Sequence, residues 1–272
     1  MNQSDGPLVF IPAAATPPPE GAFVVIVRTR EELTRCLSEP APGLDWLQVE
    51  GLLGDTEAWA NAAVDGRPVP LDVIMSNPAE EFSLLYRLAD VRLSREVRVT
   101  MPATPGFMKA LRLAASLHLA VRLLPRQPDT ATLTELTEAV TFYLHDSAVE
   151  APIEPFHSLL AQMRGTAPPV TLWEILEEDP AAFVHLDGAG QPRQAADFVA
   201  QHVRRIVEQG GECATCPWIG MCAGYFKWPD ASYSCAGVQR LIGYIESAAE
   251  EISQALAGLE GTSRQRTGKN AP

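Results

Sequence analysis

Short runs of apolar, often β-branched residues alternate with amphipathic segments over the first half of the chain. Strands are predicted at FVVIVRT (23–29), WLQVEG (46–51), LDVIMS (71–76), EVRVTM (96–101) and LAVRLLP (119–125). The segments between and after these runs have helical character, as in TREELTRCL and LTELTEAVTFYLH. Brief apolar strands that alternate with helices are typical of a parallel sheet covered by helices. The pattern therefore predicts an α/β fold with a partial parallel β/α sheet, half-barrel-like or open, because five units are too few for a closed eight-stranded barrel.

Three predicted helix starts have the spacing of a capping box, in which a threonine and a glutamate three residues later satisfy free backbone N–H groups. The pairs are Thr29 with Glu32, Thr132 with Glu135, and Thr171 with Glu174. A further helix is expected to open at Thr104, with Pro105 in its first turn.

After residue 150 the alternation gives way to turns and two longer helical segments. FVHLDGAGQPR (183–193) predicts a turn or a small hairpin, and the next segment predicts a helix with His202 on its apolar face, where a core role is favoured over a ligand role. We expect four parts. These are an extended arm (1–20), a β/α domain (21–150), a linking and cysteine-bearing domain (151–258) and a disordered tail (259–272).

Composition narrows the possible partners and the compartment. The formal net charge of −13 argues against nucleic acid or an anionic membrane surface as a broad partner, since both require a basic footprint. No run of 18 apolar residues predicts a membrane span, and the N-terminus lacks the pattern of a secretory signal. We therefore expect a cytoplasmic protein, in which clustered cysteines are metal ligands more often than disulfides.

Four of the five cysteines lie in CATCPWIGMCAGYFKWPDASYSC, with the spacing C-x2-C-x5-C-x12-C. Cys213 and Cys216 can share a tight turn, Cys222 can return to the same point, and Cys235 can close the site from a distant loop. Four thiolates suit tetrahedral Zn²⁺ or an iron–sulfur cluster, and the spacing alone does not decide between them. Disulfides are the weaker alternative. A thioredoxin-like C-x-x-C is also disfavoured. Such a motif follows a strand and opens a helix, whereas Cys213 follows a predicted helix and a Gly-Gly break.

The segment CATCPWIGMCAGY resembles the SPASM domain of radical SAM peptide-modifying enzymes, which carries C-x2-C-x5-C-x3-C and a further cysteine. The resemblance covers about residues 151–240, and more loosely the β/α units before them, which resemble a degenerate radical SAM domain. Where the family has its next cysteine this chain has Phe226. The resemblance therefore implies a single auxiliary [4Fe-4S] cluster on Cys213, Cys216, Cys222 and Cys235. With four protein thiolates such a cluster has no open iron, which implies electron transfer or a structural role.

The chain departs from the same family in the motif that generates the radical. The family requires C-x3-C-x2-C after its first strand, where this chain has only Cys36, and its glycine-rich GGEP element is replaced by VEGLLGD. The resemblance thus implies no S-adenosylmethionine cluster and no radical SAM activity. Cys36 itself is expected to be a packing residue, since no neighbouring group favours its thiolate.

The aromatic residues of the cysteine loop have two interpretations. Together with Lys227, the residues Tyr225, Phe226, Trp228 and Tyr233 could shield a centre from water, which is the favoured interpretation, or could form a docking surface. Glycines 220 and 224 are expected to permit a tight backbone path around the centre. None of the five histidines lies four residues from another, so a zinc hydrolase has little support.

The leading hypothesis is a noncatalytic partner subunit of a RiPP-type peptide maturation system. It would carry the auxiliary cluster and help to present a precursor peptide to a separate maturation enzyme. One alternative is a stand-alone β/α enzyme with a structural four-cysteine centre and a pocket near Arg28, Glu50, Ser76 and Thr100, at the carboxyl ends of the strands. The other alternative is a zinc-stabilised binding module.

Overall fold

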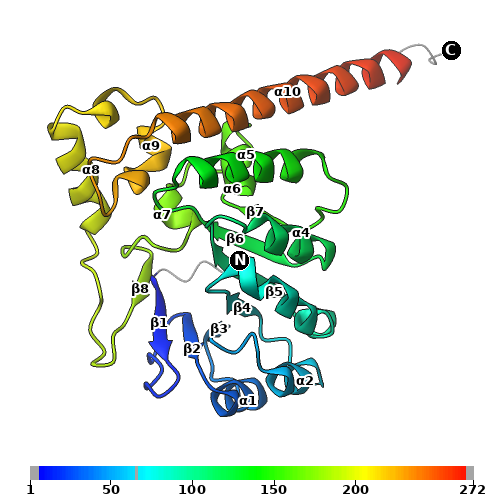
Figure 1. Cartoon of the computed structure of the whole chain (residues 1–272), viewed down its shortest axis with the longest axis vertical. Helices are drawn as coiled ribbons and strands as arrows, with labels where there is room; N and C mark the ends of the chain where they lie inside the picture. The colour runs from blue at the N-terminus through cyan, green and yellow to red at the C-terminus, as the bar shows by residue number, and fades with distance from the viewer. Residues whose placement is uncertain (1–5, 65–66, 268–272) are drawn as a thin grey trace.

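Eight parallel strands form one curled sheet, which is flanked by helices (Figure 1). The computed structural model describes residues 6–64 and 67–267, and side chains as far as residue 257. The strands are β1 (Leu8–Pro12), β2 (Phe23–Val27), β3 (Leu44–Glu50), β4 (Leu71–Ile74), β5 (Val97–Pro102), β6 (Ala120–Leu124), β7 (Ile153–Glu154) and β8 (Phe183–His185). Their order across the sheet is β7-β6-β5-β4-β3-β2-β1-β8. The two edge strands do not pair with each other, so the sheet is a half-barrel rather than a closed barrel.

The α-helices lie between and after the strands. They are α1 (Arg30–Ser38), α2 (Thr56–Val64), α3 (Pro78–Glu81), α4 (Met108–Ser116), α5 (Thr130–His145), α6 (Phe156–Met163), α7 (Leu172–Ile175), α8 (Phe198–Glu208), α9 (Ile219–Cys222) and α10 (Ala236–Thr267). Short 3-10 helices are η1 (Phe82–Leu88), η2 (Val91–Leu93), η3 (Glu212–Thr215) and η4 (Tyr225–Lys227). Within the described ranges, no helix combines the length and the apolar character needed to cross a membrane.

The predicted α/β fold with its parallel sheet is confirmed, and the five predicted strands correspond to β2 to β6. Three strands were not predicted. Residues 8–12, placed in the extended arm, form β1 and pair with both β2 and β8, so this part of the arm belongs to the sheet. The strands β7 and β8 come from beyond residue 150, so the expected domain boundary falls within one sheet.

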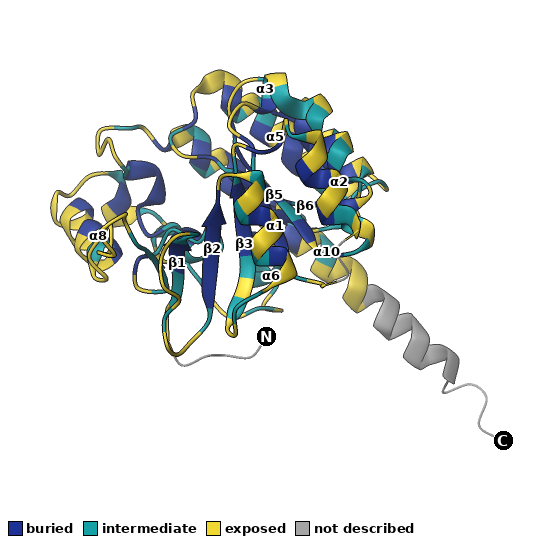
Figure 2. Ribbon diagram, turned by 90° about the horizontal axis from the view of Figure 1, so that it is seen from below, coloured by how far each residue is buried: buried dark blue, intermediate teal, exposed yellow. Residues whose placement is uncertain are grey.

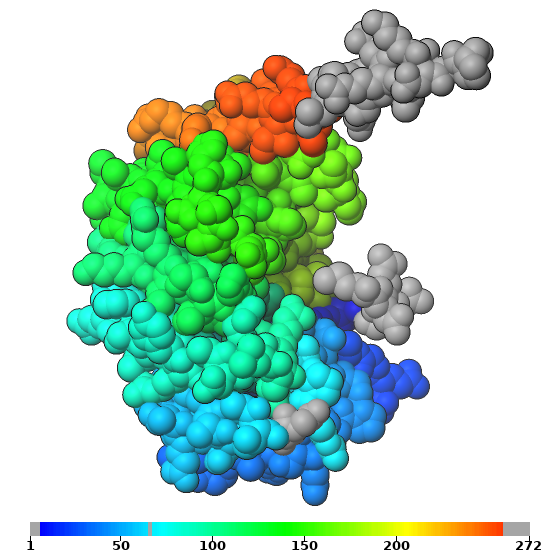
Figure 3. Space-filling view, turned by 90° about the vertical axis from the view of Figure 1, so that its right-hand side faces the viewer, coloured from blue at the N-terminus to red at the C-terminus, as the bar shows by residue number. Residues whose placement is uncertain are grey.

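At the other end of the chain, α10 continues to Thr267 and so enters the segment expected to be disordered. Residues 268–272 of that segment lie outside the described residues. In the space-filling view α10, in orange, lies directly on the green residues below it (Figure 3). These belong to the region of α5 and α6, the two helices with which α10 packs.

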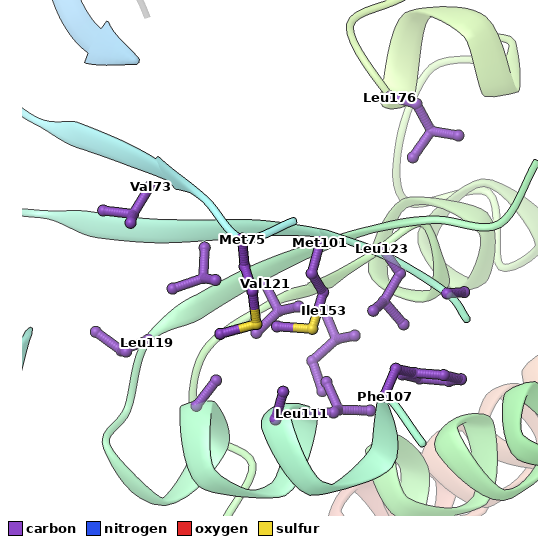
Figure 4. Close-up of a cluster of buried hydrophobic side chains, with 14 of the residues drawn as sticks. Val73, Met75, Met101, Phe107, Leu111, Leu119, Val121, Leu123, Ile153 and Leu176 are labelled. Atoms are coloured by element: carbon purple, nitrogen blue, oxygen red, sulfur yellow. The ribbon is translucent and has the colours of Figure 1, made fainter. Parts of the chain in front are cut away.

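Alternate residues of each strand face opposite sides of the sheet, and one side carries the main core. On this side Met75, Met101, Val121 and Leu123 point toward α4, where they meet Leu111 (Figure 4). All five are almost fully buried. Coloured by burial, the central strands are dark blue, and the helices beside them are yellow only on their outer faces (Figure 2). Apolar burial on this face is therefore what holds the sheet and the helices together.

The opposite, concave side carries a buried ionic network. The Asp72 carboxylate lies 2.9 Å from the Arg98 guanidinium and 2.7 Å from that of Arg122, and it accepts a hydrogen bond of 2.7 Å from Thr100. Glu177, which follows α7 and has φ +59°, pairs with both arginines from above the sheet. Two acids and two bases thus neutralise one another in the hollow of the half-barrel.

The helix starts were predicted in part. The capping boxes at Thr29 and Thr171 are both present. The one predicted at Thr132 is wrong, because Asp129 caps α5 by accepting from the Thr132 N–H. The helix expected to open at Thr104 begins at Met108 instead. Aspartate and threonine are both common N-cap residues, so the local sequence was compatible with a start of α5 at Asp129 or at Thr132.

Candidate metal centre in the cysteine loop

The four clustered cysteines line one small cavity of about 20 Å³. Cys213 lies in η3, and Cys222 is the last residue of α9. Cys235 directly precedes the long helix α10, which fixes its position. All five cysteines of the chain are free thiols. The structure thus brings together the four residues predicted as ligands and shows no disulfide among them.

The thiols share a cavity but are not arranged as a finished metal site. Among the described residues, no group of three or more histidine, cysteine, aspartate or glutamate side chains is placed to hold a metal ion. The cavity has room for about one water molecule. Binding of a metal would require the sulfur atoms to close on a common point, and a cubane cluster would also require the loop to expand.

Burial favours the protonated form of three of these thiols. It raises the pKa of Cys222 to about 11 and that of Cys235 to about 12, and it also raises the pKa of Cys213. Reactive cysteines instead have a lowered pKa, because the thiolate is the nucleophile. The raised pKa of Cys213, the first cysteine of C-x-x-C, disfavours the thiolate that thiol–disulfide exchange requires.

The backbone after Cys222 is arranged around its sulfur. Burial is the larger effect on the pKa of Cys222 and raises it, whereas the backbone N–H groups of Phe226, Tyr225 and Gly224 near the sulfur lower it and so favour the thiolate. Ala223 and Gly224 both have positive φ, +46° and +70°, which turns the chain back on itself. Backbone N–H groups that point at a sulfur are the surroundings that stabilise metal-bound thiolates.

Two side chains from outside the loop hold this turn in place. The Trp173 indole donates a hydrogen bond of 2.9 Å to the Ala223 carbonyl, and His202 Nε2 donates one of 3.0 Å to the Gly224 carbonyl. Arg205 donates to His202 Nδ1, at 3.2 Å, which leaves the proton on Nε2. His202 is 2% exposed, so the prediction that it is a satisfied core residue is confirmed.

Gly224 has no room for a side chain. A Cβ at this position would clash with Ile206 and lie 3.2 Å from the His202 ring. The expectation of a tight backbone at Gly224 is confirmed. It is wrong for Gly220, which lies inside α9 with open space around it and no positive φ.

Lys227 places a positive charge beside the thiols. It is 8% exposed, pairs with the Glu212 carboxylate at 2.5 Å and donates to the Tyr233 carbonyl. Its ammonium favours the thiolate form of Cys213 and Cys235, against the larger effect of burial. Glu212 in turn accepts a hydrogen bond of 2.9 Å from the Cys235 N–H.

Gln239, on the first turns of α10, donates to the Cys216 sulfur at 3.9 Å. Sequence reasoning missed this residue, together with Trp173 and Glu212. Lys227 was noted with the aromatic residues of the loop, but not as a support of the thiols. The others are recognised only from their contacts.

The donors present fit a centre held by four thiolates. Four thiolates around Zn²⁺ or an oxidised [4Fe-4S] core leave a net negative charge, which the Lys227 ammonium and the N–H groups at Cys222 would offset. Phe226 lines the same cavity and is buried, as is Tyr225. Trp228 and Tyr233 are partly exposed. The buried pair suits shielding better than docking.

The two remaining groups of sequence candidates lie elsewhere. Cys36 packs partly buried against the main core, as expected, and burial raises its pKa. Of the residues expected to line an alternative enzyme pocket, Arg28 and Glu50 pair with each other at 2.8 Å, and Thr100 is bound to Asp72 in the ionic network. Ser76 is exposed beside α3. Arg28, Glu50 and Thr100 thus have partners within the fold, whereas Ser76 donates its backbone N–H to Glu81.

Comparison with known proteins adds no assignment to this geometry. The chain matches no protein-family model, no curated protein and no solved structure.

Proposed function

We propose that Cys213, Cys216, Cys222 and Cys235 bind one metal centre, a [4Fe-4S] cluster or, as the alternative, Zn²⁺. The observation that carries the proposal is that all four thiols line a single cavity. The N–H groups around Cys222 and the buried Lys227 support it, because both favour negative charge on sulfur. When bound, a cluster with four protein thiolates would supply electron transfer or a structural cross-link.

The chain is proposed to act as a noncatalytic partner subunit in peptide maturation. It would hold the centre beside a separate maturation enzyme and help to present a precursor peptide. Two observations support a noncatalytic role. The sequence lacks the C-x3-C-x2-C motif, and on the concave side of the sheet Asp72, Arg98, Arg122 and Glu177 pair with one another. In this proposal the protein works in the cytoplasm.

One observation favours the zinc alternative. A cavity of about 20 Å³ is closer to the space of a single ion than to that of a cubane cluster. In that case the centre would only stabilise the loop, and the protein would be a zinc-stabilised binding module.

The test is metal analysis after anaerobic purification, combined with pull-down from cells that also express candidate maturation enzymes. We expect one centre per chain, lost in Cys222→Ala and Cys235→Ala and retained in the control Cys36→Ala. A brown protein containing iron and sulfide supports the cluster, and a colourless protein with stoichiometric zinc supports the alternative. Wild-type protein free of both metals would overturn the metal centre, and a chain with a complete centre that captures no maturation enzyme would overturn the partner role.

A further inference from the structure

We infer that a groove between α5 and α10 binds an acidic peptide segment. The inference deepens the proposed role in presenting a peptide, but it does not depend on which metal the cysteines bind. The groove encloses about 640 Å³, within the size range of ligand sites in proteins. It is lined by Asp129, Thr130, Leu133, Thr134 and Thr137 on one side, and by Tyr233, Ser234, Gly237, Arg240, Leu241 and Tyr244 on the other.

The first turns of α5 and of α10 form its walls. In Figure 1, α5 and α10 lie side by side, with the cysteine loop at one end of the pair. Gly237 allows the close approach, because a Cβ at this position would clash with Leu133. The lining extends from Thr130 to Thr137 on α5 and from Gly237 to Tyr244 on α10, about two turns of each helix. A groove between two helices suits a short peptide segment, since helix-lined grooves accept peptide side chains at regular spacing.

The α5 wall offers hydrogen-bond acceptors. The hydroxyls of Thr134 and Thr137 donate to the carbonyls of Thr130 and Leu133, at 3.0 and 2.9 Å. Their oxygen lone pairs are left to accept hydrogen bonds from a ligand. Leu133 and Leu241 add apolar surface between the polar positions. The wall can therefore bind both the backbone N–H groups and the apolar side chains of a peptide.

The charge of the ligand follows from Arg240. This exposed guanidinium makes no hydrogen bond or ion pair with another residue in the described part of the chain. The acid in the groove, Asp129, is already engaged in capping α5, where it accepts a hydrogen bond of 2.8 Å from Thr132. Arg240 is thus a local cation on a chain with net charge −13, and it favours a carboxylate in the ligand.

One end of the groove is built from the cysteine loop. The Tyr233 hydroxyl donates to the Pro128 carbonyl at 2.7 Å and so ties the loop to the start of α5. Tyr233 and Ser234 line the groove directly before Cys235, which lines the thiol cavity. A peptide in the groove would therefore lie against the segment that carries the proposed fourth ligand.

The test uses two short fluorescein-labelled peptides of Leu, Phe and Ser that differ only in carrying Glu or Lys at the same positions. Binding to the full chain is measured by fluorescence anisotropy. We expect the glutamate peptide to bind wild type at least about tenfold more tightly than the lysine peptide. Arg240→Glu should reverse this preference, and Thr137→Trp, which fills the groove, should weaken both peptides.

The matched control is Arg204→Glu, an exposed position on α8 with the same change in net charge. It should leave the glutamate peptide bound as in wild type. Equal binding of the two peptides to wild type, or equal losses in Arg204→Glu and Arg240→Glu, would overturn the inference. So would groove variants that change self-association of the chain and not peptide binding, because the occupant would then be a second copy.

Metal content measured on the same samples separates this inference from the proposed function. Arg240→Glu and Thr137→Trp should retain the metal of wild type. Peptide binding by a chain that contains no metal would uphold the groove and reject the metal centre. A metal-loaded chain without charge-selective peptide binding would uphold the metal centre and reject the groove.

Discussion

The indole nitrogen of Trp173 donates a hydrogen bond of 2.9 Å to the carbonyl of Ala223, so α7 is joined directly to the turn after Cys222. Trp173 is 2% exposed and packs edge-on against Tyr225, whose ring centroid is 5.0 Å away. The conformation of the cysteine loop therefore depends on a residue that lies outside it.

Trp173→Phe should destabilise the protein by about 1–3 kcal/mol, because it leaves a buried carbonyl without a donor while keeping most of the ring. The measurement is urea denaturation. Trp46→Phe is the matched control, since the buried Trp46 Nε1 has no hydrogen-bond partner in the described structure and its loss should cost much less. Equal losses in the two variants would show that the Ala223 hydrogen bond contributes nothing specific.

Gly224→Ala should lower stability by at least about 1–3 kcal/mol, because the residue has φ +70° and its Cβ would clash with Ile206. Loss of metal should accompany it, since the N–H groups at Cys222 depend on this turn. Gly220→Ala, in α9 of the same loop, has open space and should be neutral or stabilising by about 0.5–1 kcal/mol. Thermal denaturation and metal analysis of both variants check the contrast, which an unchanged Gly224→Ala would refute.

Lys227→Met should weaken metal retention by about tenfold or more, as is typical when a residue supporting metal ligands is lost. The substitution keeps an unbranched side chain but removes the charge beside Cys213 and Cys235. Competition with a chelator measures the effect, and circular dichroism shows whether the fold is intact. Lys109→Met, far from the loop on α4, is the control and should retain metal like wild type. Equal retention in both variants would remove Lys227 from the centre.

Stability should fall in acid as Asp72 is protonated. Burial alone would raise the pKa of Asp72, but the nearby guanidiniums of Arg122 and Arg98 outweigh burial and hold it below the usual value. A carboxyl whose folded-state pKa lies below its unfolded value of about 3.9 stabilises the fold above that pH, and this contribution is lost as pH falls through the folded pKa.

Asp72→Asn should therefore cost about 3–5 kcal/mol at pH 7, because it leaves the buried Arg122 and the half-buried Arg98 with Glu177 alone. The difference from wild type should narrow as the pH falls below about 4. Glu57→Gln, which breaks an exposed ion pair with Arg30, should cost less than about 1 kcal/mol. Denaturation curves at several pH values test both statements, and a difference independent of pH would contradict the assignment to Asp72.

The sequence by itself predicted the central sheet and the set of clustered thiols. Strands β2 to β6 are short apolar runs whose burial on the core face leaves a pattern in the chain, and the cysteine spacing indicated that four thiols meet. Such local patterns can be recognised without knowing which other segment of the chain packs against them.

Only the tertiary structure decided the rest. Strand β1 lies in a proline-rich segment, and β7 and β8 have two and three residues, so each is a strand because a neighbour pairs with it. The N-cap of α5 was ambiguous, because Asp129 and Thr132 both offer a side-chain oxygen.

The polar contacts were equally beyond the sequence. Trp173 and Ala223 are 50 positions apart, and Arg98 meets Glu177 across 79. Lys227 was visible only as a charge in a cysteine loop, and its pairing with Glu212 depends on how the loop closes. Hydrogen bonds and ion pairs between distant segments produce no periodic pattern in a sequence. They form wherever the folded apolar core brings two polar groups together, and that position cannot be read from either segment alone.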